Sequence, residues 1–171
     1  MVETTLPLRI GPDEGETVHI YGVGIRFLLR GAQTGGRFAL VEHPIAPRAL
    51  AAEAHTHTRE DEWSFVLQGE VGFLLGETEL VARAGDLVPK PRNLRHAFWN
   101  AGDAPARVLE IITPAGFEEF LDQGAAIATE HPDPEDEAAV PKWQRLTDAY
   151  GMNWEPDTIA QLVERHGLAT G

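Results

Sequence analysis

Two histidines separated by one residue are the first feature of this sequence that could do chemistry. His55 and His57 lie in the run His-Thr-His-Thr, and alternate side chains of a β-strand share a face, so both imidazoles would point the same way. Glu62 follows a polar turn, and His96 opens a later apolar run. Three imidazoles and a carboxylate suit one divalent transition metal ion per chain (Fe, Ni, Mn, Co, Cu or Zn) and do not suit Ca or Mg. Four protein ligands on an octahedral ion leave two positions open, which is typical of a catalytic site.

The same residues also fit a plainer interpretation. Taken alone, an alternating His-Thr segment followed by Arg-Glu-Asp-Glu could be an exposed polar strand and its turn. The wider spacing favours the metal site. The pattern HxHx4Ex6G is formed by His55, His57, Glu62 and Gly69, and the pattern Gx5Px4Hx3N by Gly85, Pro91, His96 and Asn100.

Short apolar runs separated by turn residues are the elements that would position these side chains. Candidate strands cover residues 18–21, 25–30, 36–43, 51–58, 62–68, 71–75, 78–82, 85–88, 96–100 and 107–112. Many short strands at near-even spacing are typical of a sandwich or barrel, and no helix-length pattern interrupts them. We therefore expect an all-β domain in residues 1–113, with its core in residues 17–113.

Helical spacing of apolar residues begins after Thr113 and Pro114. Thr113 would cap the first helix, with Pro114 in its first turn and with Phe117 and Phe120 on its apolar face. Two further short helices are predicted at residues 142–150 and 156–166, the last ending at Gly167. Since residues 114–171 are too few to fold alone, we expect this tail to pack on the outside of the barrel.

Strand parity also predicts the surroundings of the metal ion. The side chains expected to face the barrel interior beside it are Phe98, Val66 and Ser64, joined by Phe38 or Phe73. Ordinary core packing explains each of them equally well, because small barrels fill their interiors with side chains. An apolar, aromatic pocket with few cations would favour an uncharged or aromatic ligand over a sugar phosphate. The other histidines, His19, His43, His131 and His166, are expected to lie away from the metal.

The amino-acid composition excludes several kinds of binding partner and metal site. The 171 residues include no cysteine, so disulfides and thiolate metal sites are excluded. The net charge is −13 and the only lysines are Lys90 and Lys142, which argues against nucleic acid and anionic membrane surfaces as partners. No run of apolar residues is long enough to span a membrane, and no signal peptide is recognisable at the N-terminus. We expect a cytoplasmic protein.

The two spacing patterns resemble the two sequence motifs of the cupin superfamily, over residues 47–100. The resemblance implies a double-stranded β-helix, or jelly-roll barrel, with His55, His57 and Glu62 as ligands from the first motif and His96 from the second. Two positions depart from the motifs, because Ala49 and Asn93 stand where glycine is usual. Neither is a ligand, and Asn is the non-glycine residue that best tolerates a positive φ.

Within the superfamily the chain resembles the bacterial single-domain cupins related to quercetin 2,3-dioxygenase. This implies a metal-dependent dioxygenase that acts on an aromatic or enolic small molecule, with Glu62 as the base for the substrate hydroxyl. Two alternatives stay open: a non-catalytic metal-containing module that senses or stores a small ligand, and a metal-dependent isomerase or epimerase. The latter would normally need a pocket cation, for which Arg26, Arg30 and Arg37 are candidates. The resemblance also implies a homodimer that pairs through sheet faces and an N-terminal strand.

Overall fold

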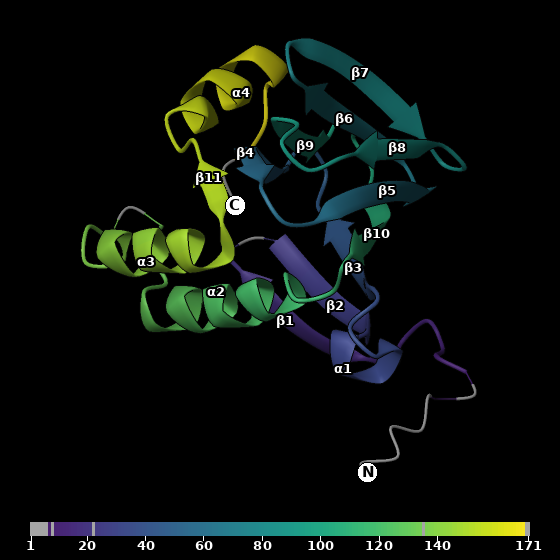
Figure 1. Ribbon diagram of the computed structural model, residues 1–171. Coiled ribbons are helices and arrows are strands. Elements are labelled where there is room, and N and C mark those ends of the chain that lie inside the picture. The colour runs from purple at the N-terminus through teal and green to yellow at the C-terminus, as the bar shows by residue number, and fades with distance from the viewer. Residues whose placement is uncertain (1–6, 8, 22, 135, 170–171) are drawn as a thin grey trace.

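Two antiparallel β-sheets face each other in this computed structural model, which describes residues 7, 9–21, 23–134 and 136–169 (Figure 1). The six-stranded sheet has the order β1 (Glu16–Ile20), β2 (Val23–Leu29), β3 (Ala39–Ile45), β10 (Ala106–Thr113), β5 (Asp61–Gln68) and β8 (Leu87–Lys90). The five-stranded sheet has the order β11 (Met152–Trp154), β4 (Leu50–His57), β9 (His96–Asn100), β6 (Glu70–Leu75) and β7 (Thr78–Arg83). This arrangement confirms the predicted all-β class with C-terminal helices.

Alternation of buried and half-buried residues explains how the strands form the barrel wall. Along β10 the buried positions are Ala106, Val108, Glu110 and Ile112, and the residues between them are only half-buried. On β5 the side chains of Glu62, Ser64 and Val66 point inward, while Phe65 and Leu67 are exposed on the outer face. This period of two is what a strand with one buried face requires.

The core is divided into three apolar clusters. The first lies between the two sheets and includes Val66, Phe73, Phe98 and Val108. The second joins the inner face of β2 and β3 to the tail, and its members include Phe27, Val41, Phe117, Phe120 and Leu146. The third packs α4 (Thr158–His166) on the outer face of the five-stranded sheet through residues that include Leu74, Trp99 and Leu162.

The described part of the tail contains three helices, α2 (Glu118–Glu130), α3 (Val140–Tyr150) and α4. Figure 1 shows α2 and α3 side by side next to β1 and β2. The prediction that the first helix begins at Thr113 is wrong by one turn. Thr113 is still the last residue of β10, where it pairs with Asp61, and its hydroxyl donates to the Arg37 carbonyl. The hydroxyl of Thr113 is thus engaged away from the helix, and Phe117 is the residue that precedes α2. The end of the last helix is as predicted, with Gly167 in the left-handed region at φ 60°.

Two short elements differ from the sequence prediction. One helical turn, α1 (Gly31–Thr34), interrupts the strand region, and β3 begins only at Ala39 because Gly35 and Gly36 have φ values of 67° and 76°. The second is β11, which lies between α3 and α4 and pairs with β4. None of the helices in the described part of the chain combines the length and apolar character that a membrane crossing needs. The division of the chain into residues 1–113 and 114–171 stays a prediction.

Candidate metal centre

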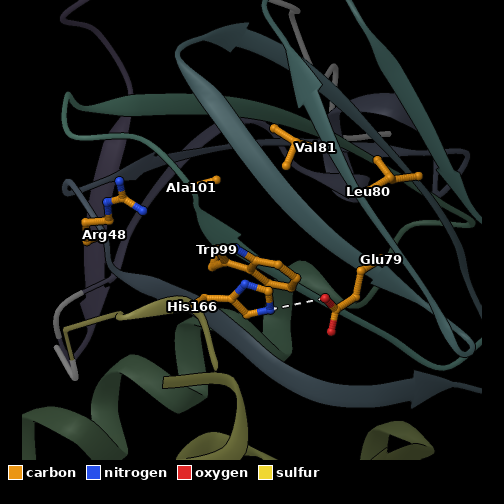
Figure 2. A pocket seen from close by; sticks show the side chains of 7 residues that line it. All are labelled: Arg48, Glu79, Leu80, Val81, Trp99, Ala101 and His166. Carbon is orange, nitrogen blue, oxygen red and sulfur yellow. Dashed lines mark ion pairs between the residues drawn. The ribbon is translucent and has the colours of Figure 1, made fainter. Parts of the chain in front are cut away.

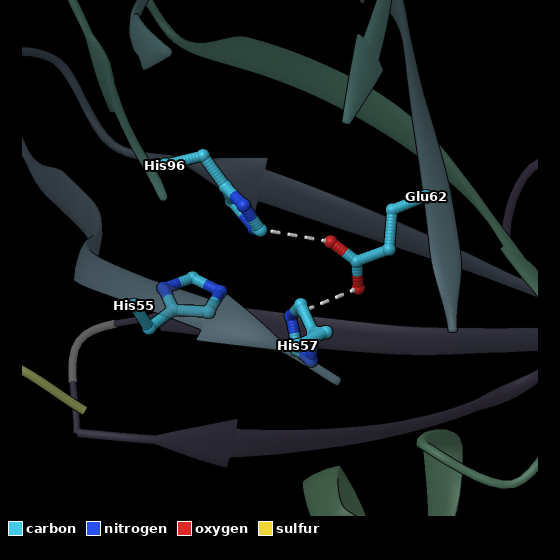
Figure 3. Close-up of side chains that lie close together, drawn as sticks. All are labelled: His55, His57, Glu62 and His96. Atoms are coloured by element: carbon cyan, nitrogen blue, oxygen red, sulfur yellow. Dashed lines mark ion pairs between the residues drawn. The ribbon is translucent and has the colours of Figure 1, made fainter. Parts of the chain in front are cut away.

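The four predicted ligands meet inside the barrel (Figure 3). His55 and His57 lie on β4, His96 lies directly opposite His55 on β9, and Glu62 reaches across from β5 of the other sheet. All four residues are buried, and one possible ligand atom from each lies within 4.8 Å of the others. The exposed-strand interpretation is therefore excluded.

Each histidine is oriented by a partner on its outer ring nitrogen. The Nδ1 atom of His55 donates to the Glu53 carbonyl at 2.8 Å, and that of His96 donates to the Leu94 carbonyl at 2.9 Å. The Nδ1 atom of His57 lies 3.1 Å from a carboxylate oxygen of the buried Glu60. Metal-binding histidines are typically held in this way, with the second nitrogen left for the ion.

Two inner nitrogens of this cluster lack a hydrogen-bond partner. Nε2 of His57 and Nε2 of His96 are buried without one, and they lie 3.6 Å and 3.4 Å from the two oxygens of Glu62. Orphaned buried nitrogens are costly, because nothing replaces the water they lose. Nitrogen donors aimed at a carboxylate in a closed site fit a divalent transition metal ion, for which these four residues would be the ligands.

The protonation states of His55, His96 and Glu62 also suit metal binding. Burial lowers the pKa of His55 well below its usual value, and it also lowers the pKa of His96, so both rings stay neutral and can bind a cation. Burial alone would raise the pKa of Glu62, but the positive charge of Lys90 and the neighbouring imidazoles outweigh it and hold the pKa well below the usual range. Glu62 is therefore a carboxylate.

Lys90 and Glu110 are the charged residues that the sequence analysis missed. The Lys90 ammonium donates to Oε2 of Glu62 at 2.9 Å and to Oε2 of Glu110 at 3.0 Å, and all three residues are buried. Burial would lower the pKa of Lys90, but the two carboxylates outweigh it and raise the value. Burial raises the pKa of Glu110 to about 7, although Lys90 opposes this rise. The available signal was parity, since Glu110 alternates with buried Val108 and Ile112.

Most of the predicted pocket residues lie in the core between the sheets. Phe98, Phe73 and Val66 belong to the first apolar cluster, and the rings of Phe73 and Phe98 stack with centroids 6.0 Å apart. Ser64 donates a hydrogen bond to Glu110 and so supports the charged group. Phe38 lies outside that cluster, half-buried on the loop between α1 and β3.

A fourth histidine faces the barrel interior. His43 is buried on β3, with its ring 5.8 Å from the ring of Phe98, and its Nδ1 atom has no hydrogen-bond partner. A hydrogen bond with the Gly24 backbone engages the ring. Burial, followed by the charge of Lys90, lowers the pKa of His43 to about 4, so the ring is neutral near pH 7. Its unpaired Nδ1 can therefore accept a hydrogen bond, and its ring lies beside Phe98.

A separate hollow of about 450 Å³ lies on the outer face of the five-stranded sheet (Figure 2). Its lining consists of Arg48, Glu79, Leu80, Val81, Trp99, Ala101 and His166. The His166 ring stacks on Trp99 at 4.2 Å, and its Nε2 faces Glu79 at 3.4 Å. Trp99 therefore contacts the tail helix α4.

Comparison with known proteins identifies the fold. The family model described as the cupin domain matches residues 42–112, which include all four candidate ligands. This match runs from β3 to β10 and so covers the central strands of the barrel. Germin-like protein 5-1 of Oryza sativa subsp. japonica is 45% identical over 60 residues, which cover 32% of this chain and 27% of that protein. Germin-like protein subfamily 2 member 1 of Arabidopsis thaliana is 42% identical over 60 residues, with the same coverage. The match thus spans only about a quarter of these curated relatives.

Solved cupin structures are similar over most of the barrel. KdgF from Halomonas sp. aligns with a TM-score of 0.59 at 16% identity, covering 67% of this chain and 99% of that one. A cupin-superfamily sugar phosphate isomerase from Silicibacter pomeroyi aligns with a TM-score of 0.55 at 24% identity, covering 61% and 74%. At these identities the likeness establishes the cupin fold and leaves the reaction open.

The structure also accounts for the two departures from the cupin motifs. Asn93 has a φ of 66°, and its backbone N–H donates to the carbonyl of His57 at 2.7 Å, so the turn forms as expected without glycine. Near Ala49 the positive φ falls on its neighbour Arg48, at 55°. Both turns therefore persist beside the ligand strands.

Proposed function

We propose that this cupin domain binds one divalent transition metal ion through His55, His57, Glu62 and His96 and oxidises an aromatic or enolic small molecule with dioxygen. The observation that carries the proposal is the convergence of three imidazoles and a carboxylate in a buried site next to aromatic rings. Phe98 is two residues from His96 on β9, and the ring of Phe117 lies 4.2 Å from the ring of His57. Such surroundings suit a flat, apolar ligand.

The metal ligands, the aromatic rings and His43 have different roles in the proposed reaction. A bound ion supplies Lewis-acid and redox chemistry for a substrate oxygen and for dioxygen. The three imidazoles are held by their outer hydrogen bonds, and the aromatic rings orient the ligand and exclude water. Glu62 accepts the proton of the substrate hydroxyl, and the neutral His43 accepts a hydrogen bond through Nδ1.

The arginines count against an isomerase or epimerase that acts on a sugar phosphate. Arg26 pairs with Glu42, Arg30 pairs with Asp122 and Glu16, and the exposed Arg37 donates to the Thr34 carbonyl. Lys90 is already engaged by two carboxylates. Three of these four cations are thus already paired with carboxylates, and Arg37 is exposed on the loop before β3.

A metal-containing binding module is the second candidate, and one observation favours it. The charge of Lys90 contributes to holding Glu62 as an anion with a pKa well below its usual range, although burial alone would raise it, and a weak base abstracts protons slowly. The test is metal analysis of unsupplemented protein, followed by oxygen uptake with a flavonol after loading with iron, nickel or manganese. Metal-dependent uptake supports the dioxygenase. Flavonol binding without uptake for any of these metals would favour the module.

We also propose that the protein is a homodimer that pairs through the outer face of β5 and β8. Phe65 and Leu87 are directly opposite each other on these strands, with exposed fractions of 36% and 52%, and Leu67 is exposed nearby. An exposed apolar patch of this kind is typical of an interaction surface. A cytoplasmic location stays a prediction.

A further inference from the structure

Lys90 occupies a position that differs sharply from that of the other lysine. Its side chain is 1% exposed, whereas Lys142 is 30% exposed and pairs with Glu130 on the surface. Lysine is almost never fully buried unless it is paired. Solubility therefore does not explain why a lysine occupies position 90.

The Lys90 ammonium is engaged by two carboxylates and one aromatic ring inside the barrel. Nζ donates to Oε2 of Glu62 and to Oε2 of Glu110, and it lies 5.0 Å from the centre of the Phe98 ring, within cation–π range. An ammonium has three donors, and two of those of Lys90 are taken by carboxylates. Lys90 is accordingly a positioning residue and not a catalytic one.

Strand pairing makes this group rigid. Lys90 on β8 is the cross-strand partner of Glu62 on β5, and Glu110 on β10 is the partner of Ser64, which is also on β5. The Ser64 hydroxyl donates to Glu110 at 2.9 Å. Three neighbouring strands thus hold four polar side chains in a row, and Glu62 is the end of that row that faces the imidazoles.

The charges of Glu62, Lys90 and Glu110 indicate how this group affects binding of a cation. Lys90 alone would neutralise Glu62 and weaken its attraction for a cation. With both carboxylates ionised, Glu110 offsets the ammonium, and the group keeps one net negative charge beside the three imidazoles. Such an arrangement retains the charge of Glu62 while fixing one of its oxygens, Oε2.

We propose that Lys90 restricts Glu62 to ligation through a single oxygen, with Glu110 offsetting the charge of Lys90. This inference rests on the metal site proposed above. A carboxylate that cannot chelate occupies one position of an octahedral ion, so three imidazoles and one oxygen leave two positions for substrate and dioxygen. A chelating carboxylate would leave only one.

The test replaces the ion pair without changing the net charge. Lys90→Met combined with Glu110→Gln leaves Glu62 as the single carboxylate of the group, and Lys142→Met is the surface control. Affinity for Co²⁺ and the cobalt absorption spectrum are measured at pH 8, where Glu110 is ionised. The double variant is expected to bind Co²⁺ about 10-fold or more weakly with an altered spectrum, as for other residues that orient metal ligands. The control is expected to match the wild type.

Three results distinguish failure of the proposed metal site from failure of the proposed role of Lys90. Wild-type protein that binds no Co²⁺ refutes the metal site itself. Equal affinity and an unchanged spectrum in the double variant overturn the role of Lys90 while leaving the metal site in place. Lys90→Gln with Glu110→Gln retains a donor at position 90, so it is expected to recover part of the wild-type spectrum, and a spectrum identical to that of the Met variant counts against the proposal.

A measurement on the unaltered protein covers the case in which the double variants do not fold. In a crystal structure of the wild-type protein with Co²⁺, Glu62 is expected to bind the ion through one oxygen while Oε2 stays within hydrogen-bond distance of Lys90. Two Glu62 oxygens on the ion would overturn the proposal.

Discussion

The ring of Phe117 meets the ring of His57 edge to face, with centroids 4.2 Å apart and planes at 82°. Phe117 immediately precedes α2, and its ring stacks on that of Phe120 at 4.7 Å. The apolar cluster of the tail therefore extends to a candidate metal ligand. Residues after the barrel contribute to the site as well as to the outer surface.

Phe117→Ala is expected to lower the free energy of unfolding by about 3–5 kcal/mol, because a buried ring is lost, and to weaken metal binding several-fold, because the His57 ring gains freedom. Leu146→Ala removes a buried side chain of the same cluster on α3 and should destabilise the protein without changing metal affinity. Chemical denaturation and calorimetric titration with Co²⁺ measure the two effects. Equal metal affinities for both variants would show that Phe117 acts only through packing.

His96→Ala is expected to abolish stoichiometric metal binding and the rise in melting temperature that metal produces. The reason is that β9 then no longer supplies a nitrogen opposite His55. His19→Ala alters an exposed histidine of β1 and should keep both properties. Elemental analysis and melting curves with and without metal provide the readout. Full occupancy in His96→Ala would contradict the ligand set.

Glu62→Gln separates ligation from proton transfer. The three imidazoles should retain much of the metal, whereas turnover should fall by about 10²-fold or more because the amide cannot accept the proton. Both proteins are loaded to equal occupancy with iron, nickel or manganese, and oxygen uptake with a flavonol is followed. Equal rates at equal occupancy would eliminate Glu62 as the base.

His43 is expected to make the metal-free protein less stable in acid. Its pKa is about 4 when folded and about 6.5 when unfolded, so the unfolded chain takes up the proton first as the pH falls. Stability is fully present above pH 6.5 and declines towards pH 4, by about 3 kcal/mol for this group. Lys90, Glu62 and Glu42 are the charged groups that influence its pKa. Denaturation of His43→Gln at several pH values should give a shallower decline, and parallel curves would contradict the assignment.

Phe65→Asp is expected to dissociate the proposed dimer, since it places a charge in the apolar patch on β5. A central interface residue is typically worth 2 kcal/mol or more, so the dissociation constant should rise about 30-fold. Val81→Asp makes the same kind of change on β7 and should leave the assembly intact. Light scattering at micromolar concentration gives the mass. A monomeric wild type would refute the dimer.

The strands were predictable because they alternate and because glycine turns separate them. The elements that were missed are too short to have a pattern of their own: α1 has four residues and β11 has three. β11 is a strand because β4 pairs with it from a distant part of the sequence. The start of α2 was misplaced because Thr113 belongs to β10, where it pairs with Asp61 of β5. This pairing between distant segments is not visible in the local sequence.

Contacts between segments distant in sequence also limited what could be predicted about the candidate site. His55 and His57 could be placed together because they share one strand, and the motif spacing linked them to Glu62 and His96. Lys90 could not be assigned, because strands β5, β8 and β10 are neighbours in space but not in sequence. Only the sheet order reveals that a lysine and two glutamates form one buried group.

The pairing of β11 with β4 also bears on how the protein is made. Trp154 pairs with His55 and Met152 with His57, so the ligand strand gains its second neighbour from near the end of the chain. On the ribosome, the His-Thr-His segment emerges long before that neighbour does. Metal capture before Met152–Trp154 has been made would therefore meet a ligand strand with one edge still unpaired.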